Sequence, residues 1–107
     1  AQGFNIMMVA RNETKMQGKI EEIKASCGIP EIQCDYIVCD FSKYTKLSEY
    51  REIFATKIEN LDIGVSILNA GYAEATKIED ASDEFLETTM NINAIHVYYV
   101  AKILSEK

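Results

Sequence analysis

Strand-like and helix-like segments alternate along this chain. Apolar runs typical of strands lie at residues 5–10, 34–41 and 61–68, and segments with apolar residues three and four positions apart lie at 12–26, 42–59 and 82–105. Asn12, and then Ser42 or Thr45, are suited to cap the first two helices, and Ser82 opens the last. The alternation predicts an α/β fold: a parallel sheet of about three strands with covering helices in the order β-α-β-α-β-α.

Composition limits the class of function. With 107 residues the chain is long enough for one small domain, and its net charge of -6 argues against nucleic acid as a partner. It contains neither an apolar run long enough for a membrane span nor a recognisable signal peptide. The three cysteines show no zinc-like or redox spacing, so we expect free thiols in a reducing compartment and no metal site.

Ligands of parallel sheets bind at the carboxyl ends of the strands, which makes the residues after the first two strands candidates. Arg11 follows the first strand, where its guanidinium can grip a 2′-phosphate with paired hydrogen bonds. Asp40 and Phe41 end the second strand. A carboxylate there can accept a hydrogen bond from the adenine amine, and the next amide can meet a ring nitrogen. An exposed arginine and a turn aspartate are the alternative interpretations.

The third strand ends in Asn69, Ala70 and Gly71, where small residues let the backbone approach a ligand closely, although an ordinary turn has the same composition. Asn93 lies inside the last helix, an unfavourable place for asparagine. Its amide can bend the helix or hold a water, unless it is simply a packed or solvent-facing polar group. His96, the one histidine of the chain, is expected to be packed or at the surface rather than catalytic.

These motifs, in this order, resemble those of the short-chain dehydrogenase/reductase family over almost the whole chain. Residues 4–11 resemble its second strand with an NADP-type arginine, and residues 38–42 resemble the adenine-contacting end of its third strand. Residues 65–71 resemble its Asn-Asn-Ala-Gly strand, with Leu68 in place of the first asparagine, and residues 90–94 resemble the segment that carries its catalytic asparagine. The subgroup looks like the 17-beta-hydroxysteroid dehydrogenases and 3-ketoacyl-CoA reductases. His96 stands where the family often has a small residue.

The resemblance implies that residues 1–107 are the central fragment of one NADP-binding Rossmann domain, without its first strand and C-terminal half. It implies NADP(H) as cofactor and a small carbonyl or alcohol as substrate of the parent enzyme. Asn93 is then catalytic, and the strand-end residues bind the cofactor: Arg11, Asp40, Phe41, Asn69, Ala70 and Gly71. Tyr98 and Lys102 have the spacing of the family's Tyr-x-x-x-Lys pair, but they follow Asn93 on the same helix and are not expected to be that pair. The chain alone is therefore expected to be inactive.

Two other classes of function stay open. The chain can be a non-catalytic nucleotide-fold module that works by protein contact. It can also be a flavodoxin-like or receiver-type domain, although the receiver type needs an acidic cluster at the strand ends, where only Asp40 is suitably placed. The absent first strand would sit between the first and third strands, so exposed sheet edges, together with the apolar last helix, predict self-association. The resemblance places the parent in the cytoplasm or on the cytosolic face of the endoplasmic reticulum.

Overall fold

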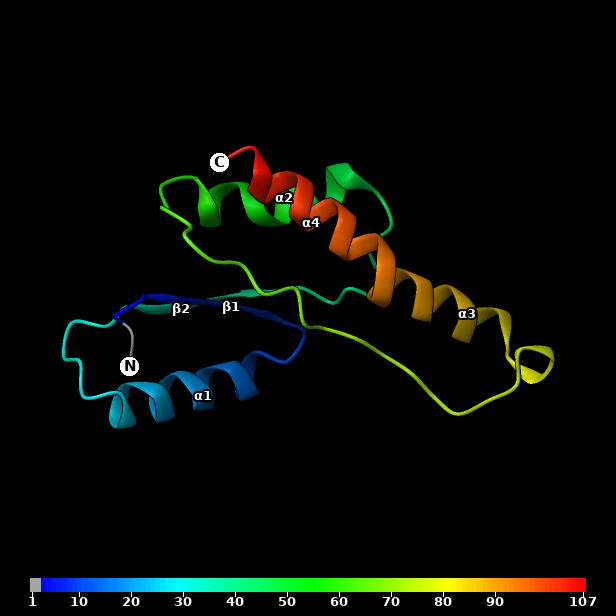
Figure 1. Ribbon diagram of the computed structural model, residues 1–107, viewed down its shortest axis with the longest axis horizontal. Coiled ribbons are helices and arrows are strands. Elements are labelled where there is room, and N and C mark those ends of the chain that lie inside the picture. Colours follow the sequence, from blue (N-terminus) through cyan, green and yellow to red (C-terminus); the bar gives the residue numbers. More distant parts are fainter. Residues whose placement is uncertain (1–2) are drawn as a thin grey trace. The chain divides into compact units, whose positions relative to one another are not determined.

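A computed structural model describes residues 3–107 of the chain, which folds as two compact units, Ala1–Asp40 and Phe41–Lys107. The elements in chain order are β1 (Ile6–Ala10), α1 (Glu13–Ser26), β2 (Cys34–Val38), α2 (Leu47–Ile58), the 3₁₀ turn η1 (Ile78–Asp80), α3 (Asp83–Met90), the π-helix η2 (Asn91–Ile95) and α4 (His96–Ser105) (Figure 1). None of the helices within residues 3–107 has the length and apolar character needed to cross a membrane.

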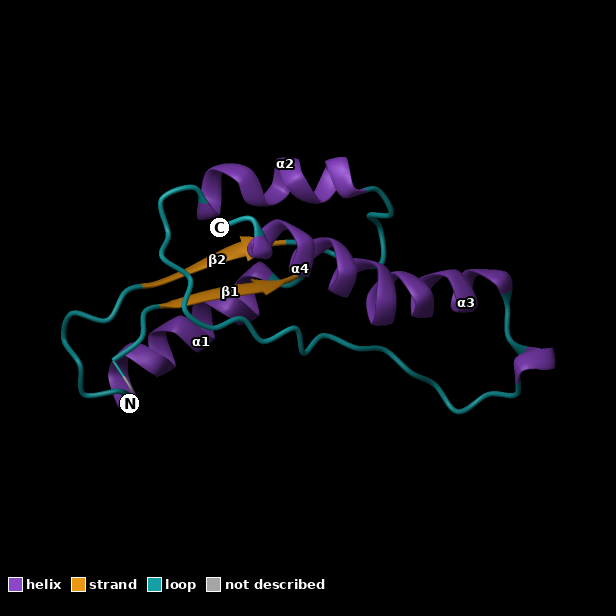
Figure 2. Cartoon of the chain, turned by 45° about the horizontal axis from the view of Figure 1, so that its top comes forward, coloured by secondary structure: helices purple, strands orange, loops and turns teal. Residues whose placement is uncertain are grey.

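The first unit is a strand-helix-strand motif. β1 and β2 pair in parallel, from Ile6 opposite Cys34 to Ala10 opposite Val38, and α1 is the crossover that parallel pairing requires (Figure 2). Asn12 caps α1 as predicted, because its Oδ1 accepts a hydrogen bond from the backbone N–H of Lys15 at 2.9 Å. The buried residues of α1 are Met16 and Ile20, four positions apart on one helix face.

The second unit is built on α2 and the C-terminal helices. In α2, Tyr50, Phe54 and Ile58 recur every four residues and are all buried, as the predicted apolar stripe requires. α4 lies beside α2 in both views (Figures 1 and 2), and the Arg51 guanidinium donates to both carboxylate oxygens of Glu106, at 2.6 and 2.9 Å. This bidentate ion pair between Arg51 and Glu106 connects the C-terminal end of α4 to α2.

The last helix begins where the sequence predicts. The Ser82 Oγ accepts a hydrogen bond from the Phe85 backbone N–H at 3.1 Å and so caps α3. From there the chain stays helical to Ser105, but residues 91–95 form the π-helix η2 instead of α-helix. The single α-helix expected over residues 82–105 is therefore two α-helical segments joined by a wider turn.

The predicted third strand does not form, so the sheet has two strands rather than about three. Residues 61–68 are irregular, and the Val65 and Ile67 side chains are 65% and 82% exposed. A parallel strand is held by hydrogen bonds to a neighbouring strand, and the described part of the chain pairs no segment with this one. An apolar sequence without a neighbour stays extended and unpaired.

Two boundaries also differ from the predictions. β2 ends at Val38, so Asp40 and Phe41 lie in the turn that follows the strand rather than in the strand itself. α2 begins at Leu47, and neither Ser42 nor Thr45 caps it. Instead the Glu49 carboxylate, one turn into the helix, accepts hydrogen bonds from the backbone N–H groups of Thr45 and Lys46, at 3.1 and 2.9 Å. Because the acceptor, Glu49, lies inside the helix, a search for a capping side chain among the residues that precede α2 does not find it.

Candidate functional site

Arg11 and Asp40 lie at the same edge of the two-stranded sheet. The strands run in parallel, and the backbone N–H of Cys39 donates to the Ala10 carbonyl at 2.9 Å, which extends the ladder to the last residue of β1. Arg11 is the next residue after β1, and Asp40 follows Cys39 in the turn after β2. Two of the predicted coenzyme ligands are thus carried by adjacent strand ends.

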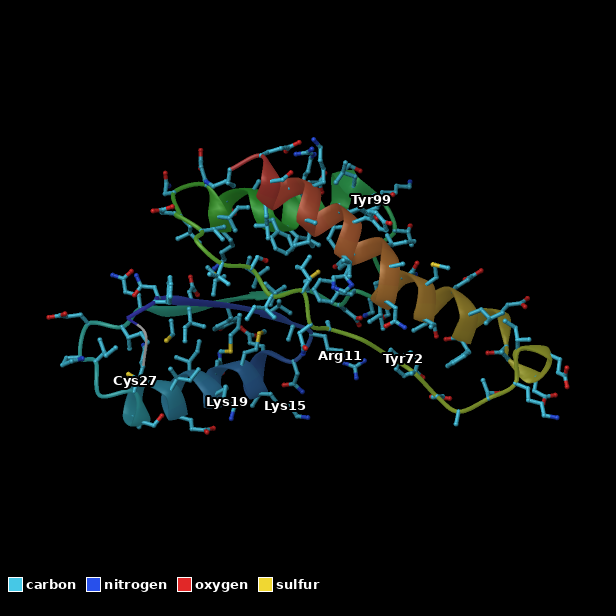
Figure 3. The ribbon with its side chains drawn as sticks, viewed as in Figure 1. Arg11, Lys15, Lys19, Cys27, Tyr72 and Tyr99 are labelled. Carbon is cyan, nitrogen blue, oxygen red and sulfur yellow. The ribbon has the colours of Figure 1, made fainter. Side chains whose placement is uncertain are left out.

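Arg11 is exposed and lies between the end of β1 and the capped start of α1 (Figure 3). No carboxylate of the described part of the first unit forms an ion pair with its guanidinium. The start of α1 adds the positive end of the helix dipole and its free backbone N–H groups, which favour an anion. Lys15, also exposed, follows one turn later, and the acid between the two cations, Glu13, accepts a hydrogen bond from the Tyr36 hydroxyl at 2.8 Å.

Asn93 is joined to the loop that follows residues 69–71. Its Oδ1 accepts a hydrogen bond from the Tyr72 backbone N–H at 2.8 Å, and its Nδ2 donates to the Tyr72 carbonyl at 2.7 Å. A Cβ added to Gly71 would lie 3.5 Å from the Asn93 Oδ1, which is ordinary contact. The structure therefore brings the predicted catalytic asparagine together with the end of the predicted small-residue motif. Asn69, Ala70 and Gly71 are themselves exposed.

The π-helix is the local feature that carries Asn93. A π-helix bonds residue i to i+5, which widens the turn, and such turns occur frequently at functional sites. Asn91, two residues earlier, donates from Nδ2 to the Ser42 carbonyl at 3.2 Å. Two asparagines in a helix interior are an unfavourable choice by propensity, and this is the signal from which a distorted turn could have been inferred. Nothing in the sequence marks Tyr72 as the partner of Asn93.

The Phe41 ring packs against the ring of His96. Its ring centroid lies 4.0 Å from that of His96, with 17° between the planes. His96 is 1% exposed, so of the two placements expected for it, the packed one is found. No described residue hydrogen-bonds its buried Nδ1. Burial lowers the pKa of the imidazole, and the nearby Ile92 carbonyl opposes this only in part, so the environment favours the neutral ring.

The comparisons with known proteins agree with the resemblance drawn from the motifs. The family model described as short chain dehydrogenase matches residues 1–107. Among solved structures, one reported with insights into 7beta-hydroxysteroid dehydrogenase stereoselectivity superposes with a TM-score of 0.71 and 26% sequence identity over 97% of this chain. The match covers 38% of that chain, so this chain spans well under half of its length. No curated protein sequence matches significantly.

Proposed function

This chain belongs to the short-chain dehydrogenase family, and we propose that it carries the adenosine-binding part of an NADP(H)-dependent carbonyl reductase. Its partial Rossmann fold provides the strand ends that such a site needs. The parent enzyme acts on a small carbonyl or alcohol, of the hydroxysteroid or 3-ketoacyl kind, in line with the hydroxysteroid dehydrogenase it is similar to. The proposal rests mainly on Arg11, an exposed cation at a strand end where NAD-binding sheets usually carry an acid.

The residues at the two strand ends fit the adenosine half of NADP(H). Arg11 has no carboxylate partner in the described first unit, and its planar guanidinium can donate two parallel hydrogen bonds to a 2′-phosphate. Asp40 and the Phe41 amide follow the neighbouring strand and would contact adenine. Ala70 and Gly71 are small and exposed, so the backbone there would approach the coenzyme. When bound, NADPH supplies the hydride that reduces a carbonyl carbon.

Asn93 has two roles in this proposal. Its side-chain amide holds the Tyr72 backbone, which positions the loop after Gly71. Each amide atom has one further hydrogen-bonding site, since Nδ2 carries a second hydrogen and Oδ1 a second lone pair. Because the side chain is exposed, it can also hold a water of the proton relay.

We propose that the 107 residues alone have no reductase activity. Tyr98 is 76% exposed on α4, and the Lys102 ammonium lies 3.1 Å from Glu106. In this proposal the Lys102 ammonium serves the ion pair with Glu106, and the family's Tyr-Lys pair is not formed by these two residues. Reduction of a carbonyl substrate by the purified chain above the rate without protein would refute the proposal.

Self-association is the second part of the proposal. Large apolar side chains are exposed on the C-terminal helices: Leu86, Met90 and Tyr98. A hollow of about 420 Å³ is lined by Thr45, Leu86, Glu87, Met90, Asn91 and Ile95. Val65 and Ile67 add an unpaired segment with strand-forming residues, and exposed apolar surface of this kind favours contact with a second chain. Light scattering that shows a clean monomer at high concentration would contradict this part.

We place the parent enzyme in the cytoplasm or on the cytosolic face of the endoplasmic reticulum. All three cysteines are free thiols. Free thiols persist in a reducing compartment, whereas secreted proteins of this size tend to pair them.

Titration calorimetry with NADPH and NADH tests the coenzyme proposal. We expect the chain to bind NADPH more tightly, and Arg11→Ala to lose this preference, because hydrogen bonds to charged groups contribute about 1.5–3 kcal/mol, a factor of roughly ten or more in Kd. Lys24→Ala is the matched control, since it removes one cation at the opposite end of α1. Equal affinity of the wild type for both coenzymes would refute the NADP assignment. If the chain binds neither coenzyme and associates with itself, the results favour the alternative of a non-catalytic nucleotide-fold module that works by protein contact.

A further inference from the structure

We propose that His96 is the positioning residue for the adenine-contacting corner of the site, because its imidazole stacks on the Phe41 ring and thereby fixes the Phe41 backbone. The inference rests on the proposed function, in which the Phe41 amide meets adenine. It assigns a role to the one histidine of the chain, which the mechanism does not otherwise use.

The His96 contact is the closest ring pair around Phe41. The centroids of Phe41 and His96 are 4.0 Å apart, whereas those of Phe41 and Tyr50 are 6.4 Å apart. Planes inclined by 17° and 14° in these two pairs put all three rings in nearly parallel arrangements. Phe41 itself lies in a turn, without the hydrogen-bond ladder of a strand or helix. The Asn91 Nδ2 donates to the carbonyl of the next residue, Ser42, at 3.2 Å, and the ring contacts hold Phe41 through its own side chain.

His96 is well suited to provide this restraint. It is the first residue of α4 and is 1% exposed, so both its backbone and its ring are held in place. Its Nδ1 is buried without a hydrogen bond from any described residue, which costs stability that an apolar side chain would not lose. What the imidazole contributes here is a flat neutral face against Phe41, since burial disfavours its charged form.

The position of His96 also couples two parts of the site. Asn93, three residues earlier, holds the Tyr72 backbone through two hydrogen bonds. The same helical segment thus holds Phe41 at one point and the loop after Gly71 at another, all within the second unit. A change in the path of this segment would move both the adenine contact and the loop beside Asn93.

Backbone ¹⁵N relaxation at Phe41, measured on the chain without coenzyme, tests the restraint directly. We expect the order parameter of the Phe41 amide to fall from about 0.85, typical of rigid backbone, to below about 0.6 in His96→Asn. It should stay high in His96→Phe, which keeps a stacking ring. Phe41→Leu removes the ring from the other side and should release the same amide. Val100→Ala, another buried residue of α4, controls for general loss of packing and should leave the amide rigid.

Calorimetry with NADPH on the same variants supplies the second arm. We expect His96→Asn to weaken NADPH binding by about fivefold or more relative to Val100→Ala, a loss of about 1 kcal/mol, and His96→Phe to restore it. An unchanged Phe41 order parameter in His96→Asn overturns the inference, whether or not coenzyme binds. A mobile Phe41 with unchanged NADPH affinity overturns it as well. Failure of the wild type to bind NADPH refutes the proposed function instead, and is read separately from the relaxation data.

Discussion

Replacing Asn93 by alanine should detach the loop at Tyr72 from the π-helix. The substitution removes two hydrogen bonds, of 2.8 and 2.7 Å, between the Asn93 amide and the Tyr72 backbone. At about 0.5–1.5 kcal/mol net for each bond, the loss is about 1–3 kcal/mol. Alanine is the better helix former by up to about 0.7 kcal/mol, which offsets part of that loss. Because the site is exposed and water can replace the lost partners, we expect a net destabilisation of about 1 kcal/mol, near the lower end of this range.

Hydrogen exchange read by NMR measures this effect at the residue concerned. The Tyr72 amide, which donates to Asn93 Oδ1, should lose its protection in Asn93→Ala, and the melting temperature should fall by several degrees. Thr56→Ala is the matched control, since it gives a similar gain in helix propensity at an exposed position of α2. If Tyr72 exchanges at the same rate in Asn93→Ala and in the wild type, the two-point contact does not hold the loop.

Two further predictions concern ionisable groups. Hydrogen bonds from Arg51 and then Lys102 lower the pKa of the Glu106 carboxyl from 4.5 to about 2, so its stabilising effect is present above about pH 4.5 and is lost as the pH falls through 2. Melting curves should therefore show a slightly steeper loss of stability over that interval for the wild type than for Glu106→Gln, and equal slopes would contradict the pairing. Burial, with a smaller effect of the Asp40 charge, raises the pKa of the Cys39 thiol to about 11. Limited alkylation followed by mass spectrometry should label Cys27 and Cys34 before Cys39, and early labelling of Cys39 would show that its burial is not maintained.

The elements that the sequence predicts correctly are those whose causes are local. Asn12 and Ser82 cap their helices by bonding to a backbone N–H three residues later, so the signal and its partner lie in the same stretch of sequence. The apolar stripe of α2 likewise depends only on spacing within the helix. The parallel pairing of β1 with β2 follows from the short crossover through α1, which leaves few other topologies.

The predictions that fail depend on a partner elsewhere in the chain. Residues 61–68 have the composition of a buried strand, yet a strand forms only against a neighbour, and composition cannot say whether that neighbour is present. The start of α2 is set by Glu49 reaching back to two backbone amides, a contact that a search for Ser or Thr before the helix overlooks. The bond between Asn93 and Tyr72 joins residues 21 positions apart and leaves no periodic trace in the sequence.

The π-helix shows why the site is harder to predict than the fold. Reasoning from periodicity assumes a turn of 3.6 residues throughout, which would place Asn93 and His96 close together on one helix face. One wider turn between them increases their angular separation, so that Asn93 meets the Tyr72 backbone while His96 meets the Phe41 ring. The two asparagines disfavour an α-helix in this segment, and both form hydrogen bonds to distant backbone groups. Asn91 donates to the Ser42 carbonyl and Asn93 donates to the Tyr72 carbonyl. A residue of low helix propensity inside a predicted helix is therefore worth testing for a contact to a distant segment. In this chain two such residues, Asn91 and Asn93, each make one.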